Sequence, residues 1–126
     1  MKKFVFLTVT MFALTVFSAS AQKNCADVKS YANNAYSYFK KAYNASSLED
    51  GQSYAKKGMN EASNAEYEAN RSKCDCDDAE SEASSAYSYG KKAYNSDSLS
   101  DLQYYAKKAM NSALEIIDEA KECENK

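Results

Sequence analysis

The chain has 126 residues, of which 16 are basic and 18 acidic, and it contains no histidine. Without histidine, neither a catalytic triad built on that residue nor a histidine-ligated metal centre is available. The slight acidic excess disfavours nucleic acid as a partner. The length suits one small domain rather than several.

The first 21 residues have the three parts of a secretory signal peptide. Two lysines follow the initiating methionine, residues 4–17 form an apolar run, and Ala-Ser-Ala at 19–21 resembles a cleavage site. The apolar run contains three threonines and is short for a membrane span. We expect a signal peptide at residues 1–21, a secreted or periplasmic protein, and no transmembrane span after cleavage.

The remaining part of the chain, residues 22–126, has few large aliphatic side chains, and Phe39 is its only phenylalanine. Alanine and tyrosine supply most of its apolar surface. Of the 16 basic residues, loss of Lys2 and Lys3 leaves 14 against 18 acidic ones, a net charge of −4. A core this thin is marginal for a small domain unless covalent links support it.

A five-residue pattern, in which two lysines precede a small residue, a large residue and asparagine, occurs four times. Its copies span residues 40–44, 56–60, 91–95 and 107–111. More widely, residues 25–73 align with residues 76–124 at an offset of 51 residues without a gap. This internal repeat indicates duplication of one structural unit. We expect residues 22–126 to form a duplicated helical-hairpin domain with repeats at 25–74 and 76–123.

Small and apolar residues recur at alternating spacings of three and four in four segments of the chain, as at Val28, Ala32 and Ala35. This period is that of one face of an α-helix. The links within each repeat, 44–47 and 95–98, are short, so the two helices of a repeat should lie antiparallel. Serines that suit helix N-caps end both links. The predicted fold is all-α, an antiparallel four-helix bundle made of two tandem helical hairpins.

The junction between the repeats, residues 72–78, contains neither glycine nor proline. It can be a tight turn capped by Asp75 or Asp77, or a continuous helix that joins the hairpins into one rod. We favour the turn. The small and apolar residues on one face of each helix form a seam, and burial of the tyrosines that flank these seams requires the two hairpins to pack on each other.

The four cysteines lie at the expected ends of the hairpins. Cys25 starts the first helix and Cys74 ends the second, while Cys76 starts the third and Cys123 ends the fourth. An antiparallel hairpin brings its two ends together, so the pairs Cys25–Cys74 and Cys76–Cys123 would close each hairpin by a disulfide. Sequence alone allows three pairings. The oxidising compartment of an exported chain favours disulfides over thiolate metal binding or a redox-active Cys74–Cys76 pair.

Eight lysines are the predicted anion-binding residues. Helical periodicity places them on the outer face of the bundle near its loops, as a basic belt. A solvated helix face is the simpler interpretation of such charges. As a binding surface, the belt would suit an anionic polymer, an anionic surface or an acidic protein, with Tyr38, Tyr89 and Tyr104 adding stacking area. The eight residues are Lys40, Lys41, Lys56, Lys57, Lys91, Lys92, Lys107 and Lys108.

Twelve of the 18 acidic residues lie towards the cysteine end, so the molecule should be electrically bipolar. Among them, Asp75, Asp77, Asp78 and Glu80 supply the oxygen ligands that calcium prefers. The cluster lacks the glycine and the spacing of an EF-hand loop, and acids are favoured at helix N-termini in any case. We therefore predict no metal site.

No catalytic residue is predicted, because the chain has no glycine-rich phosphate loop and its carboxylates lie on exposed faces, where nothing raises a pKa. The sequence predicts an exported, non-catalytic helical protein without a cofactor, acting as a binding or structural module with a basic belt. The alternative is a metal-handling protein that uses the cysteine and acidic end. Glycosylation acceptor patterns start at Asn44 and Asn70.

Overall fold

The computed structural model describes residues 22–126, and the predicted signal peptide lies outside the described residues. Within them the chain forms four α-helices and no strand. The helices are α1 (Ala26–Tyr43), α2 (Leu48–Ala69), α3 (Asp77–Tyr94) and α4 (Leu99–Glu124).

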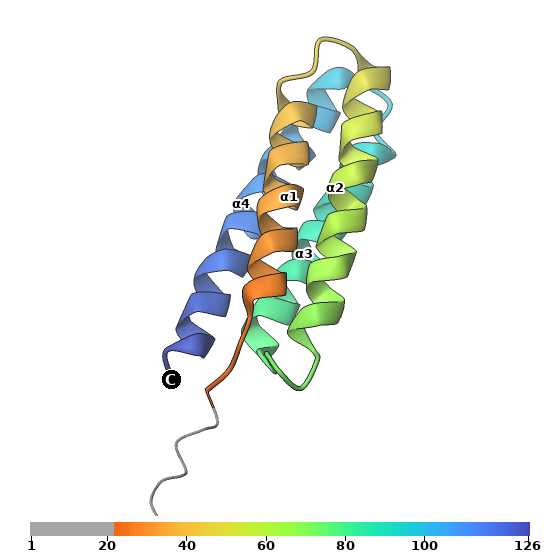
Figure 1. Ribbon diagram of the computed structural model, residues 1–126. Coiled ribbons are helices and arrows are strands. Elements are labelled where there is room, and N and C mark those ends of the chain that lie inside the picture. The colour runs from red at the N-terminus through yellow and green to blue at the C-terminus, as the bar shows by residue number, and fades with distance from the viewer. Residues whose placement is uncertain (1–21) are drawn as a thin grey trace, which may run out of the picture.

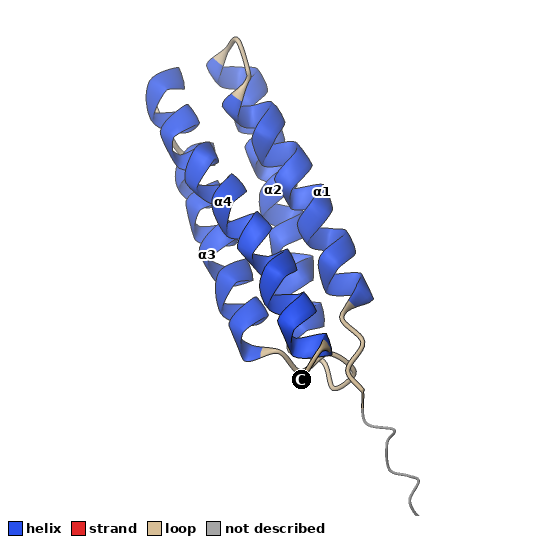
Figure 2. Ribbon diagram, turned by 90° about the vertical axis from the view of Figure 1, so that its left-hand side faces the viewer, coloured by secondary structure: helices blue, strands red, loops and turns tan. Residues whose placement is uncertain are grey.

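The four helices form a closed ring in which helices adjacent in the chain run antiparallel (Figure 1 and Figure 2). α2 packs between α1 and α3, and α4 packs between α3 and α1, whereas the diagonal pairs touch little. The α1–α2 and α3–α4 loops share one end of the bundle, which we call the loop end, and the α2–α3 turn lies at the other, the cysteine end (Figure 1). The predicted all-α four-helix bundle of two tandem hairpins is confirmed.

Local sequence signals fix where the helices begin and end. Ser47 and Ser98 precede α2 and α4, and each Oγ accepts a hydrogen bond from a backbone N–H, that of Asp50 at 3.2 Å and that of Asp101 at 3.1 Å. These caps satisfy one of the free N–H groups in the first turn of each helix. Asn44 and Asn95 are the C-caps that follow α1 and α3. The short links therefore reverse the chain without glycine or proline.

The segment between α2 and α3 is a turn, as favoured from the sequence. The backbone N–H of Cys76 donates to the carbonyl of Ala69 at 2.9 Å, and that of Asp75 donates to the carbonyl of Arg71 at 2.7 Å. Asp75 has a φ of 47°, in the left-handed region that aspartate tolerates better than most residues. The sequence suggested a turn capped by Asp75 or Asp77, but neither residue holds the N-cap position of α3. Cys76 holds the N-cap position without a side-chain cap bond, and Asp77 lies in the first turn, where its charge suits the helix dipole.

Two disulfides close the hairpins at the cysteine end, in the predicted pairs Cys25–Cys74 and Cys76–Cys123. The redox-active Cys74–Cys76 alternative is therefore wrong. Each bond closes a loop of nearly fifty residues, which corresponds to about 4 kcal/mol on the chain-entropy model. Disulfides are typical of an oxidising, extracellular environment. No helix in residues 22–126 has the length and apolarity that a membrane span requires.

Alanine fills most of the bundle interior, and Phe39 is the largest fully buried side chain. α2 and α3 present Gly58 and Gly90 to its ring. A Cβ added to Gly58 would lie 2.5 Å from Cε1 of the ring, and one added to Gly90 would lie 2.7 Å from the same atom. Both positions are therefore glycine because the ring occupies the space that a methyl group would need.

Large core residues face small ones at the equivalent position of the other repeat. Phe39 and Gly90 are 51 residues apart and in contact, and the same holds for Gly51 and Leu102, where an added Cβ would lie 2.8 Å from the leucine Cδ1. Equivalent positions thus meet near the bundle centre, where two copies of a large side chain would collide. Two further large–small pairs of buried residues keep the same offset, Val28 with Ala79 and Ile116 with Ala65.

Substitution of Gly58 by alanine should destabilise the bundle. Overpacking a filled core costs about 1 to 3 kcal/mol, and the higher helix propensity of alanine offsets up to about 1 kcal/mol of this. Chemical denaturation followed by circular dichroism measures the loss. In a Phe39→Leu background the same substitution should cost less, because the ring that it strikes is gone. An unchanged or increased stability of Gly58→Ala would contradict this account of the core.

Candidate functional site

The eight lysines of the predicted belt lie in the half of the bundle nearest the loop end. Seven are exposed and Lys108 is half-buried. The ion pairs formed within residues 22–126 use other basic groups, namely Lys29, Arg71 and Lys73. Within this part of the chain, none of the eight ammonium groups has a carboxylate oxygen within 4.0 Å. Their positive charge is therefore not neutralised by direct pairing.

Two lysines of the first hairpin lie over tyrosine rings rather than beside carboxylates. Lys41 extends from α1 and Lys57 from α2, and each Nζ lies over the rings of Tyr38 and Tyr54, at 5.7 to 5.9 Å from their centroids. The four side chains form one cluster across the outer face between α1 and α2. A cation over an aromatic ring at this distance gains about 0.5 to 1 kcal/mol at an exposed site.

The second hairpin repeats this cluster on the outer face between α3 and α4. Lys92 lies over Tyr89 and Tyr105, at 5.8 and 5.7 Å. Lys108 lies over Tyr89 and Tyr104, at 5.5 and 5.1 Å. The three tyrosines suggested as stacking surface, Tyr38, Tyr89 and Tyr104, therefore all lie against belt lysines.

Two further pairs join the hairpins. Lys56 of α2 lies 5.8 Å from the ring of Tyr94 on α3, and Lys107 of α4 lies 5.2 Å from the ring of Tyr43 on α1. Lysine–tyrosine contacts thus occur on all four sides of the ring of helices. The basic belt is a band around the bundle and not one flat patch.

A hollow of about 540 Å³ opens beside the α1–α2 loop, and we call it the first hollow. Its residues come from the end of α1, the loop and the start of α2, so the short capped link holds them together. It is lined by Ser37, Lys40, Lys41, Asn44, Ala45, Ser46, Asp50 and Tyr54.

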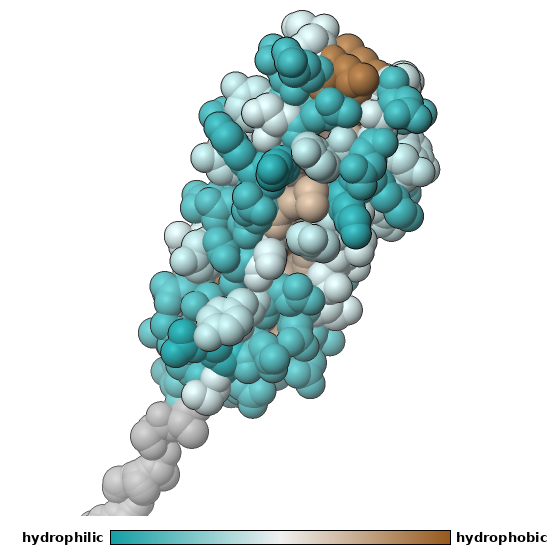
Figure 3. All heavy atoms as spheres, turned by 90° about the vertical axis from the view of Figure 1, so that its right-hand side faces the viewer, coloured by the Kyte–Doolittle hydropathy of each residue, from teal (hydrophilic) through white to brown (hydrophobic). Residues whose placement is uncertain are grey.

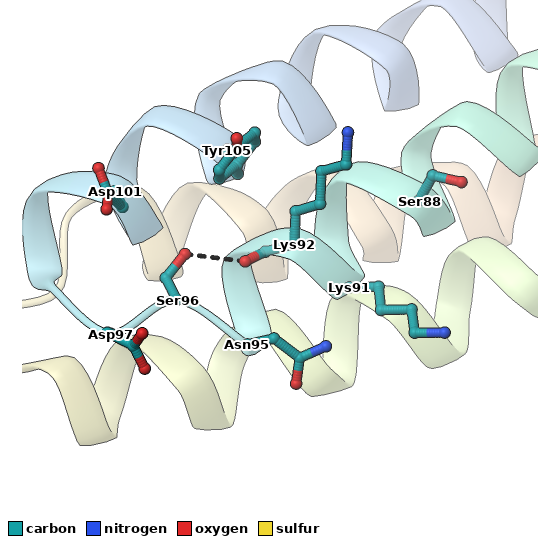
Figure 4. A pocket seen from close by; sticks show the side chains of 8 residues that line it. All are labelled: Ser88, Lys91, Lys92, Asn95, Ser96, Asp97, Asp101 and Tyr105. Atoms are coloured by element: carbon teal, nitrogen blue, oxygen red, sulfur yellow. Dashed lines mark hydrogen bonds between the residues drawn. The ribbon is translucent and has the colours of Figure 1, made fainter.

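The second hollow, of about 520 Å³, opens beside the α3–α4 loop. In Figure 4, Lys92 extends from α3 towards α4, which carries Tyr105 and Asp101, and Asp97 comes from the loop. Every lining residue stands 51 positions after one of the first hollow, and only two positions change residue type. It is lined by Ser88, Lys91, Lys92, Asn95, Ser96, Asp97, Asp101 and Tyr105.

A glutamine from the opposite hairpin contacts the loop of each hollow. Nε2 of Gln52 on α2 donates to the carbonyl of Ser96 at 3.1 Å, and Nε2 of Gln103 on α4 donates to the carbonyl of Ala45 at 3.3 Å. These two contacts are also related by the offset of 51 residues. Each hairpin therefore also contacts the loop that lines the hollow of the other hairpin.

Both hollows offer the same chemical groups. Each combines two lysine ammonium groups with an amide, hydroxyl groups, a tyrosine ring and at least one carboxylate. Ammonium and amide donors suit an anionic group, and the ring adds flat apolar area for the body of a ligand. The side of the bundle shown in Figure 3 is mostly hydrophilic, with an apolar group at its loop end. These features suit a polar ligand with negative charge.

The sequence prediction found the lysines but missed their partners in the hollows. Tyr54 and Asp50 also line the first hollow, and Tyr105 and Asp101 line the second, but none of the four is among the predicted site residues. The signal that identifies them is the repeat itself, because it keeps polar surface residues as well as buried ones at the offset of 51.

At the cysteine end, one carboxylate ties α4 to the start of α1. Glu124 accepts hydrogen bonds from Nζ of Lys29 at 2.6 Å and from the backbone N–H of Cys25 at 2.8 Å. These hydrogen bonds, that of Lys29 first, hold the pKa of Glu124 below its ordinary value of 4.5. The acid that opposes the dipole of α4 thus has a folding role through its contacts with α1.

Other acids at this end repel one another across α3 and α4. Burial raises the pKa of Glu82 above 4.5, and the charges of Glu115, Glu119 and Asp78 raise it further. Burial and then the neighbouring Glu122 raise the pKa of Glu119. The expectation that nothing raises a carboxylate pKa is therefore wrong at this cluster. The predicted concentration of negative charge at the cysteine end forms mainly on the second hairpin.

The arrangement of the cysteines and acids bears on the metal-handling alternative. All four cysteine sulphurs are in disulfides, so they are not free thiolate ligands. Within residues 22–126, no three or more cysteine, aspartate or glutamate side chains are arranged to hold a metal ion. The segment with Asp75, Asp77, Asp78 and Glu80 accordingly does not form a cage.

Comparisons with protein-family models, curated proteins and solved structures find no match for this chain.

Two glutamates five residues apart on α4 should respond oppositely to the same loss of charge. Glu119→Gln relieves repulsion and should raise the free energy of unfolding at pH 7. Glu124→Gln weakens two charge-assisted hydrogen bonds and should lower it by about 1 to 3 kcal/mol. Urea denaturation of the two variants and the parent measures both effects, and effects of equal sign would contradict the charge assignment.

The pH dependence of these effects follows from the two pKa directions. Because the pKa of Glu119 is raised, its unfavourable charge develops only as pH rises through the raised value, and the gain from Glu119→Gln should vanish as pH falls below the ordinary value of 4.5. Because the pKa of Glu124 is lowered, its favourable contribution is lost only as pH falls through the lowered value. The cost of Glu124→Gln should therefore persist to lower pH than the gain from Glu119→Gln.

Proposed function

We propose that the protein is exported, to the cell exterior or the periplasm, and acts there as a non-catalytic binding module that holds an anionic polymer. The lysine–tyrosine belt and its two hollows are the proposed binding surface. The observation that carries the proposal is the repeated hollow, whose lysines have no carboxylate partner within residues 22–126.

The tyrosines support binding by lowering its entropic cost. A free lysine side chain loses rotamer freedom when it pairs with a ligand, which costs about 0.5 to 1.5 kcal/mol per side chain. In the first hairpin, Lys41 and Lys57 already lie against Tyr38 and Tyr54. Part of that cost is then met by folding, so an anionic ligand meets a partly ordered set of donors.

The distribution of charge supports an oriented approach. Net charge is slightly negative, but the belt lysines gather near the loop end while the repelling carboxylates gather near the cysteine end. An anionic polymer is attracted to the first region and repelled by the second. The loop end should therefore meet the polymer first, and the interaction should weaken as salt screens it.

The predicted signal peptide and the two disulfides support the external location. Disulfides persist in oxidising compartments and are rare where thiols are kept reduced. A small core that depends on two such bonds would be poorly stable in a reducing cytosol.

Retention on a dextran sulphate matrix tests the binding proposal. The mature protein should be retained at low salt and elute as salt rises, and a variant with four hollow lysines changed to glutamine should elute much earlier. The four changes are Lys40→Gln, Lys41→Gln, Lys91→Gln and Lys92→Gln.

A control variant of identical net charge carries four lysine-to-glutamine changes at the cysteine end. If the hollows bind the polymer, this control should elute close to the parent. Equal loss of retention in both variants would show that net charge alone governs binding and would contradict the proposal. Tighter binding to anionic lipid vesicles than to dextran sulphate would contradict the choice of a polymer. The control changes are Lys23→Gln, Lys73→Gln, Lys121→Gln and Lys126→Gln.

A further inference from the structure

We infer that one molecule bridges two anionic chains, one in each hollow, and that the first hollow binds the anion more tightly. This inference rests on the proposed function, because it concerns the same two hollows. It makes the protein a cross-linker of its polymer, and not a cap or a single-site receptor.

The two hollows are separate sites. The first is lined only by residues 37–54 and the second only by residues 88–105, so each belongs to one hairpin. α1 and α2 form one side of the ring of helices and α3 and α4 form the opposite side (Figure 1). Two packed layers of helices place about 20 Å between opposite surfaces of a bundle. A compact anion can therefore occupy one hollow but not both.

The spacing between the hollows is fixed by the fold. Phe39 on α1 fills the space beside Gly58 on α2 and Gly90 on α3, which locks the two hairpins together through the core. At the loop end, Gln52 and Gln103 each reach the loop of the other hairpin. Because the hairpins cannot turn to bring both hollows to one side, two bound chains are held apart at opposite faces.

The hollows differ in charge at one position and in a hydroxyl at another. Ser46 of the first hollow is replaced by Asp97 in the second, which adds a carboxylate beside the same two lysines. Ala45 is replaced by Ser96, but the Ser96 hydroxyl is buried and donates to the carbonyl of Lys92 at 2.8 Å, so it is already occupied (Figure 4). The second hollow therefore gains repulsion towards an anion without gaining a free donor.

Calorimetry with sucrose octasulphate, a compact anionic disaccharide, counts the sites. We expect two molecules bound per protein, and one for either double variant, Lys40→Gln/Lys41→Gln or Lys91→Gln/Lys92→Gln. These two variants have equal net charge, so they act as controls for each other. One molecule bound by the parent would overturn the inference while leaving a single anion site in place. No binding of this probe or of dextran sulphate would overturn the proposed function as well.

Light scattering with long dextran sulphate chains tests bridging. The parent should form large, salt-sensitive aggregates near the ratio at which sites and chains balance, and each double variant should bind the chains without enlarging them. Binding by the parent without growth of the particles would show that one chain wraps the belt, and would overturn bridging. Growth that persists in both double variants would overturn it too.

Exchange of the single differing charge tests the ranking of the two hollows. Ser46→Asp should weaken the tighter sucrose octasulphate site about 3- to 10-fold at low salt, and Asp97→Ser should strengthen the weaker site by a similar factor. The two variants change net charge in opposite directions at loop positions outside the helices. If Lys91→Gln/Lys92→Gln removes the tighter site instead of the weaker one, the ranking is wrong.

Discussion

The fold depends on the close approach of four helices around a single phenylalanine ring. Alanine and glycine line the seams, so the backbones approach closely, and Phe39 fits only because Gly58 and Gly90 leave room for its ring. The same constraint governs the repeat, because equivalent positions meet near the centre and cannot both be large. The two copies of the repeat therefore differ in the core, as Gly51 and Leu102 also show.

Such a narrow core buries no tyrosine of residues 22–126 completely, although several pack half-buried against it. Tyr38 and Tyr54 are half-buried between the helices of the first hairpin, where their rings lie against Lys41 and Lys57. The candidate binding surface is thus a product of the packing, since thin seams push the aromatic rings to the surface and the rings order the lysines. Because the core contains few large apolar side chains, the two disulfides supply additional stability.

Sequence periodicity and the repeat were sufficient to predict the helices, the turn between the hairpins and both disulfides, because these depend on local pattern and on the ends of antiparallel helices. Contacts that depend on the axial register between different helices were not predictable from the sequence. The fit of Phe39 against Gly58 and the reach of Gln52 to Ser96 require the three-dimensional register. The raised pKa of Glu119 was not predictable for the same reason, because its burial and the charges near it depend on how two helices pack together.

The most direct test is an NMR titration of residues 22–126, with both disulfides formed, with sucrose octasulphate, in which backbone amide shifts locate the ligand. Binding in the two hollows should give the largest shifts in residues 37–54 and 88–105, while the amide resonances of the cysteine end should not move. Shifts centred on residues 70–82 or spread evenly over the molecule would contradict it.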